Sequence, residues 1–330
     1  MEKDFRAFVV NKDGEEFSAG IKEVKMNELP EGEVTIRVAY SSVNYKDGLA
    51  SIPNGKIVRS YPFIPGIDLA GTVVDSKDAR YQVGDEVIVT SYELGVSHFG
   101  GFSDYARVPA EWIVPLPQGL TLKEAMIYGT AGFTAALSID RLEKNGLRPE
   151  LGDVLVTGAT GGVGSMAVAM LAQKGYNVVA STGKESEHSF LRDLGAKEIL
   201  SREEIVGDKI PVLGKQRWAA AVDPVGGKTL AAIASQLNYQ GAVAVSGLTG
   251  GGEVPTTVFP YILRGVSILG VDSVYCPMET RKALWNRMAN DLKPEQLLNT
   301  IGHEITLEEL PKALSSILEG KSKGRVVVKL

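Results

Sequence analysis

The sequence predicts an α/β fold in which a doubly wound parallel sheet is joined to a second, β-rich domain, and three observations lead to this prediction. A buried strand, 154–157, runs into a glycine-rich turn and then into a helix. Strands alternate with helices after about Thr121, whereas short strands and turns fill the chain before it. The C-terminal segment 324–330 again reads as a strand. We expect a β-rich domain at 1–120, a dinucleotide-binding domain at 121–290, and a return to the first domain at 291–330.

Short strands are predicted throughout the first part of the chain. Runs rich in β-branched and aromatic residues are separated there by Gly, Pro, Asn and Asp, which is typical of strands joined by turns. The expected strands are 5–10, 34–40, 69–74, 86–90 and 105–108.

The second part is predicted to alternate between strands and helices. After the glycine turn, apolar residues recur at helical spacing from Val163 to Leu171, and Gly175 ends this helix. Six apolar strands with intervening helices fit a doubly wound parallel sheet. The expected strands are 154–157, 178–181, 198–201, 219–223, 242–246 and 267–271.

Composition excludes several classes of function. The 330 residues carry a formal net charge of −5, which argues against a nucleic-acid-binding surface. The N-terminus lacks the apolar core of a signal peptide, and no apolar run is long enough to span a membrane, so we expect a cytoplasmic protein. The single cysteine, Cys276, excludes an intrachain disulfide and a multi-cysteine zinc site. Its expected role is that of a small buried or interface side chain.

The glycine turn is interpreted as a cradle for a dinucleotide pyrophosphate. Glycines let the backbone approach phosphate closely, and the first N–H groups of the following helix attract negative charge. A glycine-rich string alone would be weak evidence, but here a strand precedes it and an amphipathic helix follows it. The expected pyrophosphate-binding residues are Thr160, Gly161, Gly162, Val163 and Gly164.

The residues after the next strand favour NADPH over NADH. An NAD site needs a carboxylate near the end of that strand for the ribose 2′-hydroxyl, and none is present at 176–184. Hydroxyl groups and cations stand there instead, and these suit a 2′-phosphate. The alternative is that Lys184 and Arg202 are ordinary solvated charges. The expected residues at the adenosine end are Ser181, Thr182, Gly183, Lys184 and Arg202.

Several further motifs carry a resemblance over essentially the whole chain. They are the segments 42–47, 65–73, 84–87, 129–135 and 221–227, which read SVNYKD, PGIDLAGTV, GDEV, GTAGFTA and AVDPVGG. With the central glycine turn, they resemble the medium-chain dehydrogenase/reductase superfamily. The chain is most similar to the zinc-free quinone oxidoreductase branch and its YhdH/YhfP-type subgroup, which includes acryloyl-CoA reductases. This resemblance implies a Rossmann domain, a GroES-like catalytic domain and a homodimer paired through the strand at 267–271.

The same resemblance implies that there is no catalytic metal. Zinc-dependent relatives have a cysteine and a histidine where this chain has Asn44 and Asp68, and the four-cysteine lobe is missing too. The three histidines are scattered in the sequence. Without a Lewis acid, electron-poor acceptors such as quinones, enones and enoyl thioesters are the expected substrates.

Site residues follow from the resemblance. Asn44 and Tyr45 stand at the family's reaction centre, where Tyr45 either donates a proton or hydrogen bond to the acceptor or only stacks on the nicotinamide. Asp47 is expected to cap the short helix that follows, and Asp68 to hydrogen-bond loop backbone. The residues expected to line the nicotinamide half are Thr130, Leu248, Ile262 and Ser273.

The sequence therefore predicts an NADPH-dependent oxidoreductase that reduces a quinone or an enoyl thioester of the acryloyl-CoA type. Lys56 and Arg59 are candidates for contact with CoA phosphates, with plain solvation as the alternative. A catalytically weak NADPH-binding redox sensor or structural partner is the alternative function.

Overall fold

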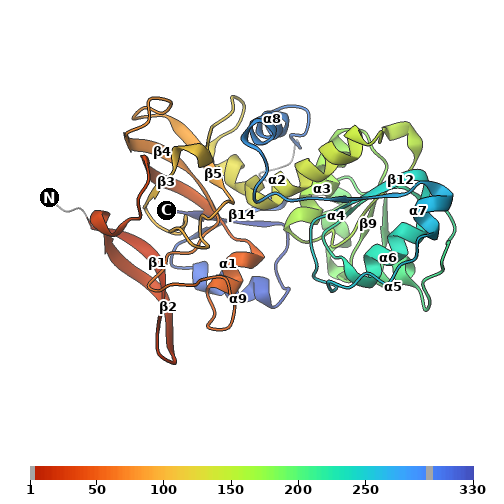
Figure 1. Ribbon diagram of the computed structural model, residues 1–330, viewed down its shortest axis with the longest axis horizontal. Coiled ribbons are helices and arrows are strands. Elements are labelled where there is room, and N and C mark those ends of the chain that lie inside the picture. Colours follow the sequence, from red (N-terminus) through yellow and green to blue (C-terminus); the bar gives the residue numbers. More distant parts are fainter. Residues whose placement is uncertain (1–3, 295–299) are drawn as a thin grey trace. The chain divides into compact units, whose positions relative to one another are not determined.

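The computed structural model describes residues 4–294 and 300–330, which form two compact units (Figure 1). The first contains the chain up to Thr130 with Val274–Asn286 and Gly302–Leu330, and the second contains Ala131–Ser273 and Arg287–Ile301. The sequence assigned 274–286 to the second domain. This segment joins the first unit because Arg281 donates hydrogen bonds to Thr90 and Trp285 packs edge-on against Tyr128.

The first unit is built on two sheets whose strand pairs are antiparallel, except that β14 and β15 pair in parallel. A seven-stranded sheet has the order β14-β15-β3-β4-β5-β7, with β6 also paired to β3, and β1 and β2 form a separate two-stranded sheet. Its core contains fully buried Val34, Ile36, Leu69 and Val87. The strands are β1 Asp4–Asp13, β2 Glu16–Lys25, β3 Val34–Ser42, β4 Asp68–Ser76, β5 Glu86–Thr90, β6 Tyr105–Val108, β7 Ile113–Pro115, β14 Gly302–Thr306 and β15 Arg325–Lys329.

Three of these strands were not expected from the sequence. Most side chains of β2 and β14 are exposed or half-buried, so neither strand carries the apolar pattern that predicts a buried strand. The third, β7, is only three residues long and pairs with β5. The predicted C-terminal strand is present as β15, which pairs antiparallel with β3.

The second unit contains a six-stranded parallel sheet of order β10-β9-β8-β11-β12-β13. Strand order reverses between β8 and β11, so the predicted doubly wound fold is confirmed. The helices α3 and α6 flank this sheet (Figure 1). The strands are β8 Val154–Val156, β9 Val178–Ser181, β10 Glu198–Leu200, β11 Trp218–Asp223, β12 Leu237–Val245 and β13 Ser267–Gly270; the helices are α3 Gly162–Gln173, α4 His188–Asp193, α5 Arg202–Val206, α6 Gly227–Gln236 and α7 Phe259–Arg264.

The described residues contain four further α-helices. The longest, α2, is interrupted at Gly129, whose backbone has φ +50° and ψ −157°. Among residues 4–294 and 300–330, no helix is both long and apolar enough to cross a bilayer. The bounds are α1 Tyr45–Ala50, α2 Leu122–Lys144, α8 Met278–Ala289 and α9 Leu310–Leu318.

Candidate functional site

The buried carboxylate of Asp68 is the centre of a polar network in the first unit. Asp68 begins β4 and is fully buried. Its Oδ2 accepts hydrogen bonds from Ser42 Oγ at 2.7 Å and Asn44 Nδ2 at 2.7 Å. Thr130 donates twice, from its backbone N to Oδ2 at 2.9 Å and from Oγ1 to Oδ1 at 2.6 Å. The expectation that Asp68 bonds only loop backbone is therefore wrong, because three side chains from distant segments converge on it.

Arg325 places a buried positive charge beside this carboxylate. It opens β15, and its Nη2 lies 3.9 Å from Asp68 Oδ2. The guanidinium donates to the carbonyl oxygens of Ile127 and Val43, each at 3.1 Å, and to Ser42 Oγ at 3.0 Å. Burial lowers the pKa of Arg325, while the negative charges of Asp68 and Asp47 oppose that shift. The network therefore contains the charge pair of Asp68 and Arg325, and both side chains also form hydrogen bonds with neighbouring residues.

Asp47 adds a second buried carboxylate. It is fully buried, and it accepts the backbone N–H of Asn44 at 2.8 Å and that of Ile67 at 2.9 Å. Burial raises the pKa of Asp47 to about 7, and the nearby charge of Asp68 acts in the same direction. Asp47 was expected to cap a helix that follows it. It lies instead inside α1 and caps that helix from its third position.

These contacts fix the start of α1. Asn44 is the residue before the helix, and it is held through its backbone by Asp47 and through its side chain by Asp68. Tyr45, the first residue of α1, is 51% exposed. The buried residues Asp47 and Asp68 therefore hold the start of α1, while the Tyr45 side chain stays accessible. A side chain that contacts a ligand needs such a rigid support.

The residues at the expected zinc positions do not fit a zinc ion. Structural and catalytic zinc sites use thiolate, imidazole and carboxylate ligands, whereas here the neutral amide of Asn44 donates to Asp68. The described residues contain no group of three or more His, Cys, Asp and Glu side chains arranged to hold a metal. Asp68 already accepts four hydrogen bonds and lies beside the cation of Arg325.

The glycine turn of the second unit has the geometry of a phosphate cradle. After β8, Gly158 adopts φ +53°, and the N–H of Gly161 donates to its carbonyl at 2.9 Å. Gly161 is then the N-cap of α3. A Cβ on Gly164 would overlap the carbonyl oxygen of Gly158, so the helix and turn pack closely only because a glycine stands there. Thr160 and Val163 lie in the same turn and first helical turn.

The expected adenosine-end residues converge beyond β9. Thr182 is buried, and its Oγ1 accepts the backbone N–H of Lys184 at 3.1 Å. Ser181 Oγ donates to the carbonyl of Ser201 at 3.4 Å, which links β9 to the start of α5. A Cβ on Gly183 would lie 3.1 Å from Arg202 Nε and 3.2 Å from its Cζ. Gly183 therefore leaves the space that the guanidinium of Arg202 occupies, and the two segments form one cationic corner.

The four residues expected at the nicotinamide half are divided between the two units. Thr130 belongs to the first unit, where it binds Asp68. In the second unit, Leu248 and Ile262 are 70% and 68% exposed. Ser273 Oγ accepts a hydrogen bond from Thr134 Oγ1 at 2.9 Å.

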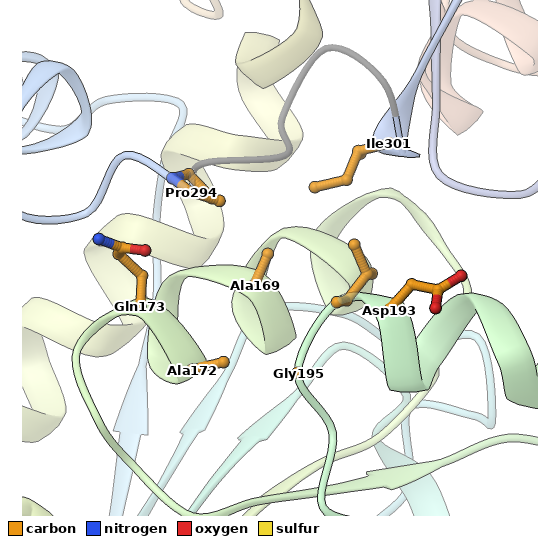
Figure 2. Close-up of a pocket in the computed structure, with 8 residues that line it drawn as sticks. Ala169, Ala172, Gln173, Asp193, Gly195, Pro294 and Ile301 are labelled. Carbon is orange, nitrogen blue, oxygen red and sulfur yellow. The ribbon is translucent and has the colours of Figure 1, made fainter.

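A cavity in the second unit lies away from the glycine turn. It is bounded by the C-terminal half of α3 and by α4, whereas the turn precedes the N-terminus of α3 (Figure 2). Among the described residues that line it, Asp193 has the one charged side chain and most of the others are apolar. A dinucleotide phosphate binds at a helix N-terminus, so this cavity is not the cofactor cradle.

Three residues of the Asp68 network were not singled out by sequence reasoning. Ser42 and Gly129 fell within motifs of the resemblance but had no role, and Arg325 was only part of the predicted C-terminal strand. A Cβ on Gly129 would lie 2.5 Å from Asp68 Oδ2 and 2.8 Å from Arg325 Nη2. An arginine directly before the apolar run 326–328 was the one available signal, because buried charges need partners.

Comparison with known proteins agrees with the two-domain fold. Residues 30–118 match the family described as "Alcohol dehydrogenase GroES-like domain", and residues 162–290 match "Zinc-binding dehydrogenase". A Bacillus subtilis protein, YhfP, whose name describes a quinone oxidoreductase, is 60% identical over 326 residues covering 99% of each chain. The acrylyl-CoA reductase AcuI of Ruegeria pomeroyi is 49% identical over 326 residues, 98% of each chain.

Solved structures show the same similarity. The crystal structure of YhfP with NAD bound has a TM-score of 0.97 and covers 99% of this chain and 100% of that chain. The yhdH oxidoreductase of Salmonella enterica in complex with NADP has a TM-score of 0.95 at 47% identity, covering 98% of this chain and 99% of that chain.

Proposed function

The chain belongs to the medium-chain dehydrogenase/reductase superfamily, and from this premise we propose that it is an NADPH-dependent, zinc-independent oxidoreductase. Its acceptor is a quinone or an activated C=C bond, such as that of an enoyl thioester. The names of the relatives, quinone oxidoreductase and acrylyl-CoA reductase, support both acceptor classes.

The observation that carries the proposal is the hydrogen bond between Asn44 and Asp68. These two residues stand at the positions that bind zinc in metal-dependent relatives, and here they bind each other. The side chains that would hold a Lewis acid for the polarisation of a simple ketone are therefore missing. A quinone, or an enone or enoyl thioester, delocalises incoming charge over its own conjugated system. Such an acceptor needs only orientation and a hydrogen-bond donor for the developing negative charge.

Tyr45 is the side chain proposed to meet the acceptor. Bound NADPH supplies hydride to the β-carbon of an enoyl thioester, and a proton adds to the α-carbon. The exposed phenol of Tyr45 either donates a hydrogen bond or proton to the acceptor, or stacks on the nicotinamide. A Tyr45→Phe variant separates these roles: unchanged turnover removes the donor role, and a large loss in kcat with little change in the KM for NADPH supports it.

The preference for NADPH rests on the corner formed by Gly183 and Arg202. The Arg202 guanidinium lies where a Cβ of residue 183 would crowd it, and Ser181 and Thr182 directly precede Gly183 in the chain. Guanidinium and hydroxyl groups bind a ribose 2′-phosphate through charge-assisted hydrogen bonds. The relatives differ in what they were crystallised with, NAD for YhfP and NADP for the Salmonella protein, so the cofactor must be tested directly.

The test of the proposed function follows NADPH oxidation at the nicotinamide absorbance, with acryloyl-CoA and a simple quinone as parallel acceptors and NADH as the control reductant. Fast turnover on the thioester identifies an enoyl-CoA reductase, and turnover on the quinone alone identifies a quinone reductase. Tight NADPH binding with neither activity contradicts the proposal and favours a redox sensor or structural partner.

For a thioester substrate, Lys56 and Arg59 are proposed to meet CoA phosphates. Both side chains are exposed, in the loop that follows α1. Hydrogen bonds from Ser97 and Tyr275 lower the pKa of the Glu93 carboxyl, and the positive charge of Arg59 acts in the same direction. A Lys56→Ala/Arg59→Ala variant should raise the KM for the CoA ester and leave that for a quinone unchanged. An unchanged KM for the CoA ester rejects the contact.

The homodimer is proposed to form through β13. This strand ends the order of the parallel sheet, and its Ile268 is 37% exposed. An unpaired, apolar edge strand is a template for pairing with a second copy. Light scattering coupled to size-exclusion chromatography measures the mass directly, and a monomer at all concentrations contradicts the dimer.

A further inference from the structure

The hydroxyl oxygen of Ser246 is shielded from solvent, and among the residues that the structure describes it has no hydrogen-bond partner. Buried polar groups in folded proteins almost always have a partner, so an exception calls for an explanation. Ser246 follows directly after β12, at the carboxyl end of the parallel sheet, where ligands bind in doubly wound folds.

The position of Ser246 is fixed by its neighbours across the sheet. Its N–H donates to the carbonyl of Asp223 at 3.1 Å. Asp223 ends β11, and its carboxylate accepts Thr157 Oγ1 at 2.5 Å and the N–H groups of Val225 and Gly226 at 3.0 Å each. The ends of β8, β11 and β12 are therefore tied together, and Ser246 is linked through Asp223 to the start of the glycine turn.

The strand order indicates which half of a bound dinucleotide lies near Ser246. The glycine turn follows β8, and the corner of Gly183 and Arg202 lies beyond β9, on one side of β8 in the sheet. β11 and β12 lie on the other side. Neighbouring strands are about 4.8 Å apart, so Ser246 lies roughly 10 Å from the glycine turn in the direction away from the adenosine end. That is the side on which the nicotinamide half must lie.

Close packing beside Ser246 leaves the turn little freedom. A Cβ on Gly247 would overlap the carbonyl oxygen of Pro224, and the N–H of Gly250 donates to the carbonyl of Val225 at 2.7 Å. The backbone is thus held, while the serine hydroxyl can turn about its Cα–Cβ bond between staggered positions. Because Ser246 as a residue is only half-buried, that rotation can bring the oxygen to a ligand.

We propose that the Ser246 hydroxyl is a direct ligand of the nicotinamide half of NADP(H), through the nicotinamide ribose or the carboxamide. The unpartnered hydroxyl of the free protein gains its hydrogen bond when the dinucleotide binds. This role depends on cofactor binding and not on which acceptor is reduced, so it stands or falls separately from the proposed function.

The test uses the full chain with Ser246→Ala and measures the Kd of NADP⁺ and of 2′,5′-ADP by calorimetry. 2′,5′-ADP carries the adenosine end with its 2′-phosphate and lacks the nicotinamide. Loss of one hydrogen bond should weaken NADP⁺ binding about 2- to 10-fold and leave 2′,5′-ADP unchanged. The melting temperature of the free variant should be equal to or above that of the unmodified protein, because the removed hydroxyl had no partner.

Ser235→Ala is the matched control. Ser235 is a buried serine of the same unit, and its hydroxyl donates to the carbonyl of Ala232 at 2.9 Å. Its removal should lower the melting temperature and leave both affinities unchanged. NADP⁺ binding by Ser246→Ala at full strength overturns the proposal and assigns the hydroxyl to a water molecule. Equal weakening of NADP⁺ and 2′,5′-ADP overturns it as well, because the role is then structural.

Discussion

Replacement of Gly129 by alanine should disrupt the Asp68 network. A Cβ at this position would lie 2.5 Å from Asp68 Oδ2 and 2.8 Å from Arg325 Nη2, and it would overlap Ser42 Oγ. The backbone φ of +50° with ψ −157° is also one that a non-glycine residue rarely adopts. Backbone strain contributes about 1–3 kcal/mol. Overpacking contributes about 1–3 kcal/mol more. The free energy of unfolding should fall by roughly 2–6 kcal/mol in total.

Gly84→Ala is the control variant, which adds a Cβ at a positive φ away from the network. Gly84 lies in the same unit with φ +100°, and a Cβ there would meet nothing within 4 Å. This variant carries backbone strain alone, so Gly129→Ala should be less stable than Gly84→Ala by about 1–3 kcal/mol. Urea unfolding of the two variants at one pH measures the difference. Equal stability of the two variants would refute the argument that Gly129 is required because the network leaves no room for a side chain.

Two further predictions concern charge. Burial raises the pKa of Asp47 to about 7 from 3.8, so its contribution to stability is complete below pH 3.8 and is lost as the pH rises through 7. The free energy of unfolding, measured with urea between pH 5 and 8, should fall less steeply with rising pH for Asp47→Asn than for the unmodified protein. An equal slope for the two proteins would contradict the raised pKa of Asp47. Arg202→Gln should raise the Kd for NADPH about 10-fold with little effect on NADH. Arg192→Gln, which removes an exposed charge in α4, should change neither Kd, and parallel weakening of NADPH and NADH by Arg202→Gln would reject a 2′-phosphate contact.

The sequence predicted the second unit better than the site of the first. A glycine turn between a strand and a helix is a local signal, and the strands at 154–157 and 178–181 appear in the structure as β8 and β9. The corner of Gly183 and Arg202 was predicted because both residues follow recognisable strands of one sheet. Its details depend on side-chain packing, so they required the structure.

The Asp68 network could not be predicted in the same way, because its members are distant in the chain. Arg325 binds the carbonyl of Ile127 and the hydroxyl of Ser42, which are 198 and 283 positions away. No periodicity of hydrophobic residues encodes such contacts. A motif can indicate that Asn44 and Asp68 stand at a functional position, but only the fold shows that they bind each other.

The composition of this network argues for a role in positioning. Asp47 and Asp68 place two buried carboxylates near one buried arginine, and a buried charge pair is weak evidence for stability, because desolvation can cost as much as the pair returns. The network joins the end of β3, the start of β4, the break in α2 and the start of β15 at one point. Asn44 donates its backbone N–H to Asp47 and its side-chain amide to Asp68, and these two carboxylates set its orientation. An apolar replacement of similar volume could pack this space, but it could not hold Asn44 by both backbone and side chain. The buried charges are thus best understood as what fixes Tyr45 and Thr130 in place.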